Sequence, residues 1–291
     1  MNSSVLTAVF LPLSLAIIML GMGLSLTPAD FKRVALFPKA TFVGLFCQLI
    51  LLPATAFVCL LIFPQPPELA VGVMLISFCP GGATSNLISN LARADVALSI
   101  TLTAIASIVT VFSIPLLVNY SMEYFMGEGK YLELPVTQTM IQILAITVIP
   151  VSIGMLIRWK FPDFSIRSEK PVKIMSAIFI TIIIAGVYYS ERDNLGDFFL
   201  QVGLITLFIN LAILVIGYYF SGLFKLSHPQ RSAVAIEGGI QNGTLAITIA
   251  TSSFLLNNPE MAIPPAVYSL IMFFTGFLAV YVLSRRKMFE K

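Results

Sequence analysis

Charged residues are scarce in this sequence. Only 11% of its 291 residues are Asp, Glu, Lys or Arg, whereas 58% are hydrophobic and the mean hydropathy is +0.95. A soluble domain carries about 25% charged residues, because water must wet its surface. The shortage of charge excludes an ordinary soluble domain. It predicts an all-α membrane protein, since lipid is the solvent that tolerates so apolar a surface.

Net charge, cysteine and histidine are also in short supply, and each shortage excludes a class of protein. The net charge of +3 gives no sign of a nucleic-acid-binding face. The three cysteines, Cys47, Cys59 and Cys79, are scattered through apolar runs, unlike a disulfide framework. The single histidine, His228, lies in an expected loop, and the sequence has no metal-ligand cluster and no Gly-x-Ser-x-Gly motif. We expect no enzyme, because catalysis within a membrane would need paired reactive groups at depth.

Long apolar segments dominate instead. A spanning helix needs about 20 mostly apolar residues, and the chain has nine such segments. The first lacks the basic start and the cleavage site of a signal peptide, so we interpret it as a span. The connections are short, so we expect residues 1–291 to form a single transmembrane domain. The segments lie at about 5–26, 40–63, 69–92, 96–119, 136–158, 172–190, 198–223, 230–256 and 264–284.

The basic residues support this count and give an orientation. Cytoplasmic loops of membrane proteins hold the excess of Lys and Arg. If the N-terminus lies outside, 15 of the 17 basic residues fall on the inner side, and only Lys130 and Arg192 fall outside. If a span had been missed or added, every loop after that point would change sides, and the basic residues would be divided between the two sides. The split predicts nine spans, with the N-terminus outside and the C-terminus in the cytoplasm.

Helix-breaking residues interrupt two of these segments. The third contains Pro80, Gly81 and Gly82, and the eighth contains Gly238 and Gly239. Proline removes a backbone donor and clashes with the preceding turn, while glycine relaxes the backbone. In hydrocarbon the freed N–H and C=O groups need partners, so a break persists only against protein or a cavity. The pattern predicts two broken helices.

The positions of the two breaks predict inverted repeats. The third segment runs from outside to inside, and the eighth, five segments later, runs the opposite way. In inverted-repeat transporters such breaks meet near the midplane, where half-helix N-termini face an anionic substrate and unwound carbonyls bind the coupling ion. We expect a first repeat at about 5–119 and a second at about 172–284. The segment at 136–158 then has no counterpart.

Glu237 is the only one of 14 acidic residues well inside a segment. An ionisable residue at membrane depth costs at least about 2.5 kcal/mol and marks a functional site by default; the alternative is a protonated structural carboxyl. Other polar side chains flank the breaks or form a stripe along the fourth segment, where Ser and Thr can also bond their own helix. A hard cation prefers such oxygen ligands. These side chains are Ser85, Asn86, Ser99, Thr103, Ser107 and Gln241.

Several short motifs are spread along nearly the whole chain. They are Gly21-Met22-Gly23-Leu24, Pro28-Ala29-Asp30-Phe31, Gln48 with Pro53-Ala54-Thr55-Ala56, Cys79–Asn86, Leu91-Ala92-Arg93, Asp95–Ser99 and Glu237-x-Gly239-x-Gln241-Asn242. Together they resemble the bile acid:sodium symporter family. The family has a ten-helix form and a nine-helix form that lacks the first helix. The chain is similar to the nine-helix form, in agreement with its unpaired fifth segment.

The resemblance implies two sodium sites and a substrate site. The first sodium site would use the side chains of Ser85, Asn86, Ser99, Thr103 and Glu237. The second would use Gln48, Glu237 and Gln241 with the backbone carbonyls of Gly238 and Ile240. The substrate would face Ala83, Thr84 and Asn242. Bacterial relatives often have Thr-Ala before the serine, whereas this chain has Ala83-Thr84, so a substrate contact differs.

The resemblance also implies an architecture and an activity. The first, fifth and sixth spans would form a panel, against which a core of the other six moves. The chain would be a symporter in the plasma membrane of a bacterium, importing an organic anion with sodium as its coupling ion and no other cofactor. Its substrate would be a bile acid, a sulfated steroid or a small carboxylate. The alternative is a proton-coupled or uncoupled carrier on the same fold; inverted breaks suit an ion channel less well.

Overall fold

The computed structural model describes residues 11–127, 134–190 and 195–286. Within these residues the chain is helical, and its one β contact is an isolated bridge between Gly81 and Gln241. The elements are α2 (Leu11–Gly23), α3 (Pro28–Leu36), α4 (Pro38–Phe46), the π-helix η2 (Cys47–Leu51), α5 (Leu52–Ile62), α6 (Pro67–Phe78), α7 (Ala83–Leu91), α8 (Val96–Met126), α9 (Val136–Ile146), α10 (Val148–Lys160), α11 (Pro162–Ser190), α12 (Leu195–Leu223), α13 (His228–Gly239), α14 (Gly243–Thr251), the 3-10 helix η3 (Glu260–Ala262) and α15 (Ile263–Arg286).

Long apolar helices identify an integral membrane protein. Five described helical stretches are long and apolar enough to span a bilayer, and each matches an expected segment. They are Pro38–Ile62, Val96–Met126, Val136–Lys160, Gln201–Leu223 and Glu260–Arg285. The first expected segment corresponds to α2, although its first residues, together with Lys130 and Arg192, lie outside the described part of the chain. The sixth corresponds to α11, and the number nine stays a prediction.

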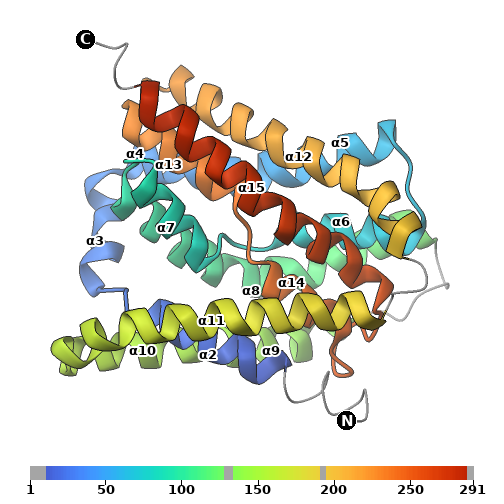
Figure 1. Cartoon of the computed structure of the whole chain (residues 1–291), viewed down its shortest axis with the longest axis horizontal. Helices are drawn as coiled ribbons and strands as arrows, with labels where there is room; N and C mark the ends of the chain where they lie inside the picture. Colours follow the sequence, from blue (N-terminus) through green and yellow to red (C-terminus); the bar gives the residue numbers. More distant parts are fainter. Residues whose placement is uncertain (1–10, 128–133, 191–194, 287–291) are drawn as a thin grey trace.

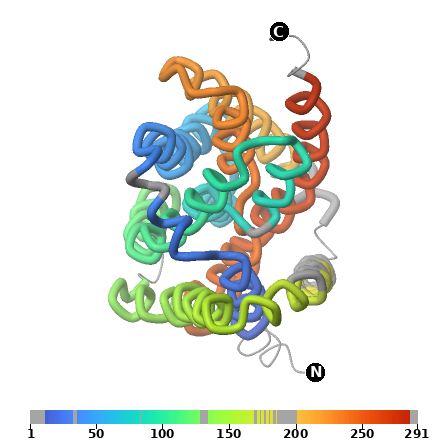
Figure 2. Tube along the Cα trace, turned by 90° about the vertical axis from the view of Figure 1, so that its left-hand side faces the viewer, coloured from blue at the N-terminus to red at the C-terminus, as the bar shows by residue number. Residues whose placement is uncertain are grey.

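The helices are arranged in two layers (Figures 1 and 2). The lower layer consists of α2, α9, α10 and α11, and the upper layer of α4 to α8 with α12 to α15. Within the lower layer α2 packs against α10 and α11. A β-carbon on Gly23 of α2 would collide with the Val151 carbonyl, and one on Gly154 of α10 would collide with the Leu20 carbonyl. The two backbones therefore touch, as small residues allow between membrane helices.

The two expected breaks are present and cross one another. The chain leaves helical geometry between α6 and α7, around Pro80, and again between α13 and α14. The two short extended segments then pair with each other. The Gly82 amide donates to the Ile240 carbonyl at 3.3 Å, and the Asn242 amide donates to the Pro80 carbonyl at 2.8 Å. Each break thus supplies backbone partners to the other, which hydrocarbon could not do.

A third interruption was not expected from the sequence. The span at 136–158 is divided at Thr147 into α9 and α10. Pro150 explains the division, because a proline has no N–H to donate and its ring crowds the carbonyl four residues earlier, that of Ile146. The Ile143 carbonyl accepts both the Thr147 hydroxyl at 2.5 Å and the Thr147 backbone amide at 2.9 Å, which holds Thr147 on the last turn of α9.

The expected cytoplasmic loop before the sixth span is mostly helix. Only Phe161 separates α10 from α11. Pro162 is the first residue of α11, where a backbone N–H has no partner within the helix, so the proline removes no helical hydrogen bond. We expected a loop between the segments at 136–158 and 172–190, including residues 167–170, and this expectation is wrong because these residues lie in the first turns of α11. The second expected repeat correspondingly begins at a helix that starts ten residues before 172.

A short amphipathic helix, α3, connects the layers at one end of the molecule (Figure 1). We expected only a loop there. Thr27 precedes the helix, and both its amide and its hydroxyl donate to the Asp30 carboxylate at 2.7 Å. This arrangement caps the first turn of α3. The Asp30 carbonyl accepts a hydrogen bond from Thr101 of α8 at 2.9 Å, which fastens α3 to the upper layer.

Candidate functional site

The Glu237 carboxylate lies in the last turn of α13 and is only 1% exposed. Its Oε2 accepts a hydrogen bond from the Ser99 hydroxyl at 2.8 Å, and its Oε1 accepts one from the Thr103 hydroxyl. Ser99 and Thr103 are four residues apart on α8, so they project from one face of that helix. The polar stripe expected on this span therefore meets the buried carboxylate.

The surroundings of Ser99 contain more acceptors than donors. Its hydroxyl lies 3.0 Å from Asn86 Oδ1 as well as 2.8 Å from the Glu237 carboxylate, while Ser89 donates to it at 3.2 Å. A hydroxyl carries one proton, so it cannot satisfy both acceptors fully. Ser85 is fully buried, donates to the Gly82 carbonyl at 2.7 Å and also contacts Glu237. All five side chains of the first predicted sodium site thus lie together, in a group rich in oxygen and poor in protons.

The second predicted group contains buried amides without partners. Gln48 is 1% exposed, and neither its Oε1 nor its Nε2 has a hydrogen-bond partner within the described part of the chain. A β-carbon at Gly81 would collide with the Glu237 carboxylate and lie 3.3 Å from Gln48 Nε2. Gln48, Gly81 and Glu237 are therefore immediate neighbours. An unpartnered buried amide is costly, which makes this arrangement a candidate for a ligand.

Gln241 completes this group from the other side of the break. Its Nε2 donates to the carbonyls of Glu237 at 3.1 Å and Gly238 at 2.7 Å, while its buried Oε1 has no partner among the described residues. The Ile240 carbonyl accepts from Gly82. Both predicted ligand carbonyls, those of Gly238 and Ile240, thus have one hydrogen bond and retain a second lone pair.

Gln48 is carried by a π-helix that sequence reasoning missed. In η2 the hydrogen bonds span five residues, as between the Leu52 amide and the Cys47 carbonyl. Pro53 follows at once and cannot donate to the carbonyl of Leu49, so the ordinary ladder is already broken there. Single π-helical turns occur often at functional sites. The proline five residues after Gln48 is the signal that could have revealed it.

The predicted substrate residues lie where the two half-helices begin. Asn242 is the N-cap of α14, and its Oδ1 accepts from the Leu245 amide at 3.0 Å. Its Nδ2 lies 4.0 Å from the Met19 sulfur of α2, so this end of the site reaches the lower layer. Ala83 begins α7, which has no side-chain cap, and the half-buried Thr84 follows. Uncapped helix N-termini attract anions.

Comparison with known proteins identifies the family of the chain. The family model described as "Sodium Bile acid symporter family" matches residues 12–198. The "Uncharacterized sodium-dependent transporter YocS" of Bacillus subtilis is 30% identical over 260 residues, 89% of this chain and 78% of that protein. The "Probable sodium/metabolite cotransporter BASS1, chloroplastic" of Arabidopsis thaliana is 30% identical over 88% of this chain and 62% of its own length. The human "Ileal sodium/bile acid cotransporter" is 27% identical over 96% and 80%.

The family model covers residues 12–198, which include the first broken helix, the polar face of α8 and the π-helix, and the Bacillus relative covers 89% of the chain. The chain is therefore a member of the sodium bile acid symporter family.

Proposed function

We propose that the protein is a sodium-coupled symporter that imports an organic anion by alternating access. The observation that carries this proposal is the Glu237 carboxylate, which is buried at the crossing of two broken helices. Its hydrogen bonds within the described residues come from neutral hydroxyl groups, which carry no compensating charge. A buried charge needs a counter-charge, which a bound cation would provide.

Two sodium ions would bind on either side of this carboxylate. The first would be held by Glu237 with the oxygens of Ser85, Asn86, Ser99 and Thr103, where acceptors exceed protons. The second would be held by Glu237 with Gln48, Gln241 and the carbonyls of Gly238 and Ile240, where two amide oxygens have no partner in the described chain. A carboxylate shared by both ions would couple their binding, because each ion offsets part of one charge.

The organic anion would bind beside the ions, where α7 and α14 begin. The N-terminus of α7, at Ala83 and Thr84, has no side-chain cap and would offer its backbone N–H groups. The N-terminus of α14 is capped by Asn242, whose side-chain amide would contact the anion. The names of the relatives give a range, from bile acid to other metabolites. For this chain we propose the range that the family resemblance implies: a bile acid, a sulfated steroid or a small carboxylate.

Alternating access would come from movement between the two layers. The lower layer corresponds to the first, fifth and sixth of nine proposed spans, and the upper layer to the other six. Backbone contact between Gly23 and Gly154 supports treating the lower layer as one rigid panel. The inverted repeats at about 5–119 and 172–284 would give two pseudosymmetric states of the crossing. The membrane would be the plasma membrane of a bacterium, with the N-terminus outside.

A proton-coupled carrier is the second candidate, and the same observation favours it. A proton on Glu237 would also neutralise the buried charge: the protonated carboxyl would donate a hydrogen bond to the Ser99 hydroxyl, whose own O–H would then donate to Asn86 Oδ1. In that case the carboxyl would titrate instead of binding sodium.

Transport into reconstituted vesicles separates the two candidates. A thermal-shift screen of organic anions, with and without sodium, first identifies a ligand. Its uptake is then measured with a sodium gradient at fixed pH, with a choline gradient at fixed pH, and with a pH gradient in choline without sodium. Concentrative uptake that requires sodium at constant pH supports the proposal. Uptake driven equally well in choline by a pH gradient would instead establish proton coupling.

A further inference from the structure

The carbonyl of Gly239, at the end of α13, is held by two buried side chains from outside the crossing. Asn210 of α12 donates to it from Nδ2 at 2.7 Å, and Tyr268 of α15 donates to it from its hydroxyl at 3.0 Å. Asn210 is 0% exposed and Tyr268 is 1% exposed. We propose that Asn210 and Tyr268 are positioning residues, which fix the break in α13 in the geometry that sodium binding requires. This inference rests on the proposed function.

The carbonyl of Gly239 differs from the other three carbonyls at the end of α13 in the source of its hydrogen-bond donors. The last four carbonyls of a helix have no partner within it. Here three of the four are satisfied locally, by the backbone amide of Ile240 and the side-chain amide of Gln241. The fourth, that of Gly239, receives its donors from α12 and α15. Asn210 and Tyr268 thus fasten the break to the two long helices beside it.

The chemistry of Asn210 indicates that it orients the Gly239 carbonyl and does not serve packing alone. The Asn210 Oδ1 atom is buried and has no hydrogen-bond partner in the described part of the chain. An apolar side chain would fill the same space without leaving a buried acceptor unsatisfied. The amide is therefore an expensive residue for packing alone. Its benefit lies at the Gly239 carbonyl, where two donors specify one direction of the C=O group.

The backbone of the break also lies directly against α12. A β-carbon on Gly239 would come within 2.7 Å of the Leu214 side chain, one turn from Asn210. The Gly239 backbone therefore packs closely against α12, and the direction of its carbonyl sets the peptide plane shared with Ile240. The carbonyls of Gly238 and Ile240, which flank it, are proposed sodium ligands. Releasing one donor from Gly239 would let both ligand carbonyls reorient.

Two conservative variants test the proposal. Tyr268→Phe removes one hydroxyl and keeps the ring, and Asn210→Leu keeps the approximate shape of the amide. Their matched controls are Thr206→Val on α12 and Thr275→Val on α15, because each hydroxyl bonds only to its own helix. The melting temperature of the full chain is followed while sodium chloride replaces potassium chloride at constant ionic strength. This titration gives the half-saturating sodium concentration.

We expect the half-saturating sodium concentration to rise about three- to tenfold in Tyr268→Phe and Asn210→Leu, as for the loss of one hydrogen bond. In potassium these variants should melt close to their matched controls, and uptake at saturating sodium should stay near the wild-type rate. If Asn210→Leu does not fold, Tyr268→Phe alone decides the matter.

An unchanged half-saturating concentration with a lowered melting temperature in both salts would overturn the inference, since it would make both residues structural. Failure of the proposed function looks different, because the wild-type protein would then show no sodium-specific rise at all, and the inference would be lost with it.

Discussion

At the scale of single residues, the site is defined by an imbalance between acceptors and protons. The Glu237 carboxylate and Asn86 Oδ1 share one Ser99 proton, and the amide oxygens of Gln48 and Gln241 have no partner among the residues that the structure describes. An acceptor left unsatisfied in a low-dielectric interior is costly. A cation removes that cost at several oxygens at once, so sodium should stabilise the folded protein.

Glu237→Gln tests this balance most directly, because it keeps the shape and one carbonyl oxygen but removes the charge. A ligand that binds only the folded state stabilises it by about 2.7 kcal/mol at 100 times its Kd. We expect wild type to melt higher in sodium than in potassium, and Glu237→Gln to melt alike in both. In potassium the variant should be as stable as wild type or more so, since an uncompensated buried charge has been removed. Sodium-driven uptake should be abolished.

A full sodium-specific shift together with concentrative uptake in Glu237→Gln would contradict the assignment. Glu237 would then be a structural residue, whose role is limited to its hydrogen bonds with Ser99 and Thr103.

Asn86 and Ser99 should affect the ion more than the substrate. Each places one oxygen beside the Glu237 carboxylate. We expect Asn86→Ala or Ser99→Ala to raise the half-saturating sodium concentration of uptake about tenfold, as for the loss of about 1.4 kcal/mol. The substrate Kd in saturating sodium should change by much less. Ser121→Ala is the matched control, because Ser121 is buried on the same helix but bonds to its own backbone at Leu117. A loss of substrate affinity at unchanged sodium dependence would move both residues to the substrate site.

The sequence identified only part of this site. Glu237 stands out because a carboxylate within a span is costly and is seldom kept there without a function. Gln48 was found through family resemblance, since one amide in an apolar segment carries little information by itself. Asn210 and Tyr268 gave no signal, because their role depends on which carbonyl they reach across 29 residues. Contacts of that kind are set by packing, and no local pattern encodes them.

At the scale of elements, the prolines of the sequence led us to expect the break at Pro80 but not the break at Pro150. Pro80, followed by two glycines, interrupts its span as expected, and Pro150 interrupts the span at 136–158 unexpectedly. Pro115 and Pro171 lie inside the continuous helices α8 and α11. A proline frees the same backbone groups in each case. Whether the helix parts depends on neighbouring groups that satisfy them, which the sequence of one segment does not contain.

The adjacent glycines at the first break give a prediction about the crossing itself. A β-carbon at Gly81 would collide with the Glu237 carboxylate and lie 2.7 Å from its Cδ, whereas one at Gly82 would meet nothing closer than the Gln241 carbonyl at 3.4 Å. We therefore expect Gly81→Ala to abolish sodium-driven uptake and to destabilise the protein by about 1–3 kcal/mol through overpacking. Gly82→Ala should retain uptake and change stability by less than about 1 kcal/mol.

Melting curves and vesicle uptake of the two alanine variants provide the measurement. Equal behaviour of Gly81→Ala and Gly82→Ala would show that the carboxylate does not lie against the first break.

At the scale of the whole molecule, hydropathy could not predict which helices belong to which of the two layers. Lipid-facing and protein-facing surfaces of membrane helices are both apolar, so all long segments look alike. The expected panel of the first, fifth and sixth spans came from family resemblance alone. The physical basis is visible only in three dimensions, where α2 packs on α10 and α11 while α14 and α8 meet the lower layer at α2 and α9.

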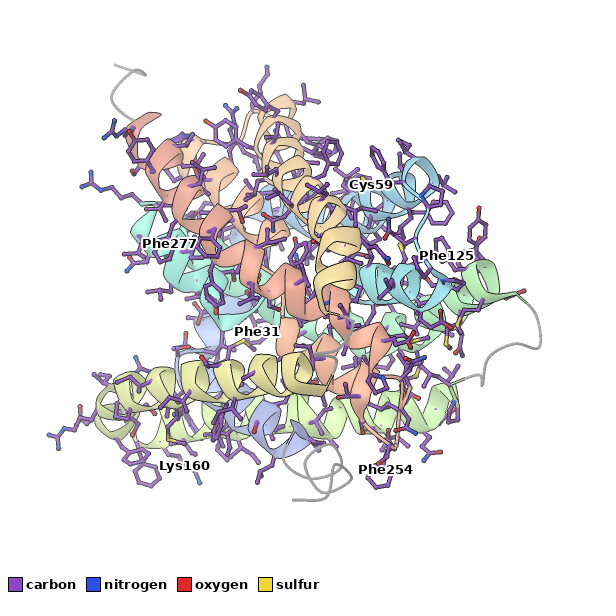
Figure 3. The ribbon with its side chains drawn as sticks, turned by 45° about the vertical axis from the view of Figure 1, so that its right-hand side comes forward. Phe31, Cys59, Phe125, Lys160, Phe254 and Phe277 are labelled. Carbon is purple, nitrogen blue, oxygen red and sulfur yellow. The ribbon has the colours of Figure 1, made fainter. Side chains whose placement is uncertain are left out.

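Trp159 reports on how the lower layer sits in the bilayer. It is the only tryptophan of the chain, lies at the end of α10 beside Lys160 (labelled in Figure 3) and is 70% exposed. Phe161 and Phe164 are exposed beside it, as in the aromatic belt of an interface. We expect its fluorescence in vesicles, excited at the red edge to avoid tyrosine, to be quenched by lipids brominated near the headgroup. Lipids brominated near the chain ends should quench it much less. Stronger quenching from the chain ends would place this end of α10 within the hydrocarbon.

The proposed orientation of the protein rests on the distribution of its basic residues, and cysteine labelling tests it. Fifteen of 17 basic residues fall on one side when the N-terminus is outside. The native cysteines are at most 3% exposed, so they should give little background. Glu123→Cys probes the end of α8 that is proposed to lie outside, and Arg167→Cys probes the end of α11 that is proposed to lie inside; both positions are exposed. Glu123 is a better site for the introduced cysteine than nearby Gly127, because the Gly127 backbone has a φ of 86°, which strains any residue with a side chain.

An impermeant maleimide applied to intact cells should label Glu123→Cys, and should label Arg167→Cys only after the membrane is opened. The reason is that the excess of Lys and Arg is retained on the cytoplasmic side during insertion. A cysteine at position 2 should react like the one at 123, although the N-terminal residues lie outside the described part of the chain. Labelling of Arg167→Cys in intact cells would reverse the orientation. Labelling at 123 but not at position 2 would keep the orientation of α8 and change the number of spans before it.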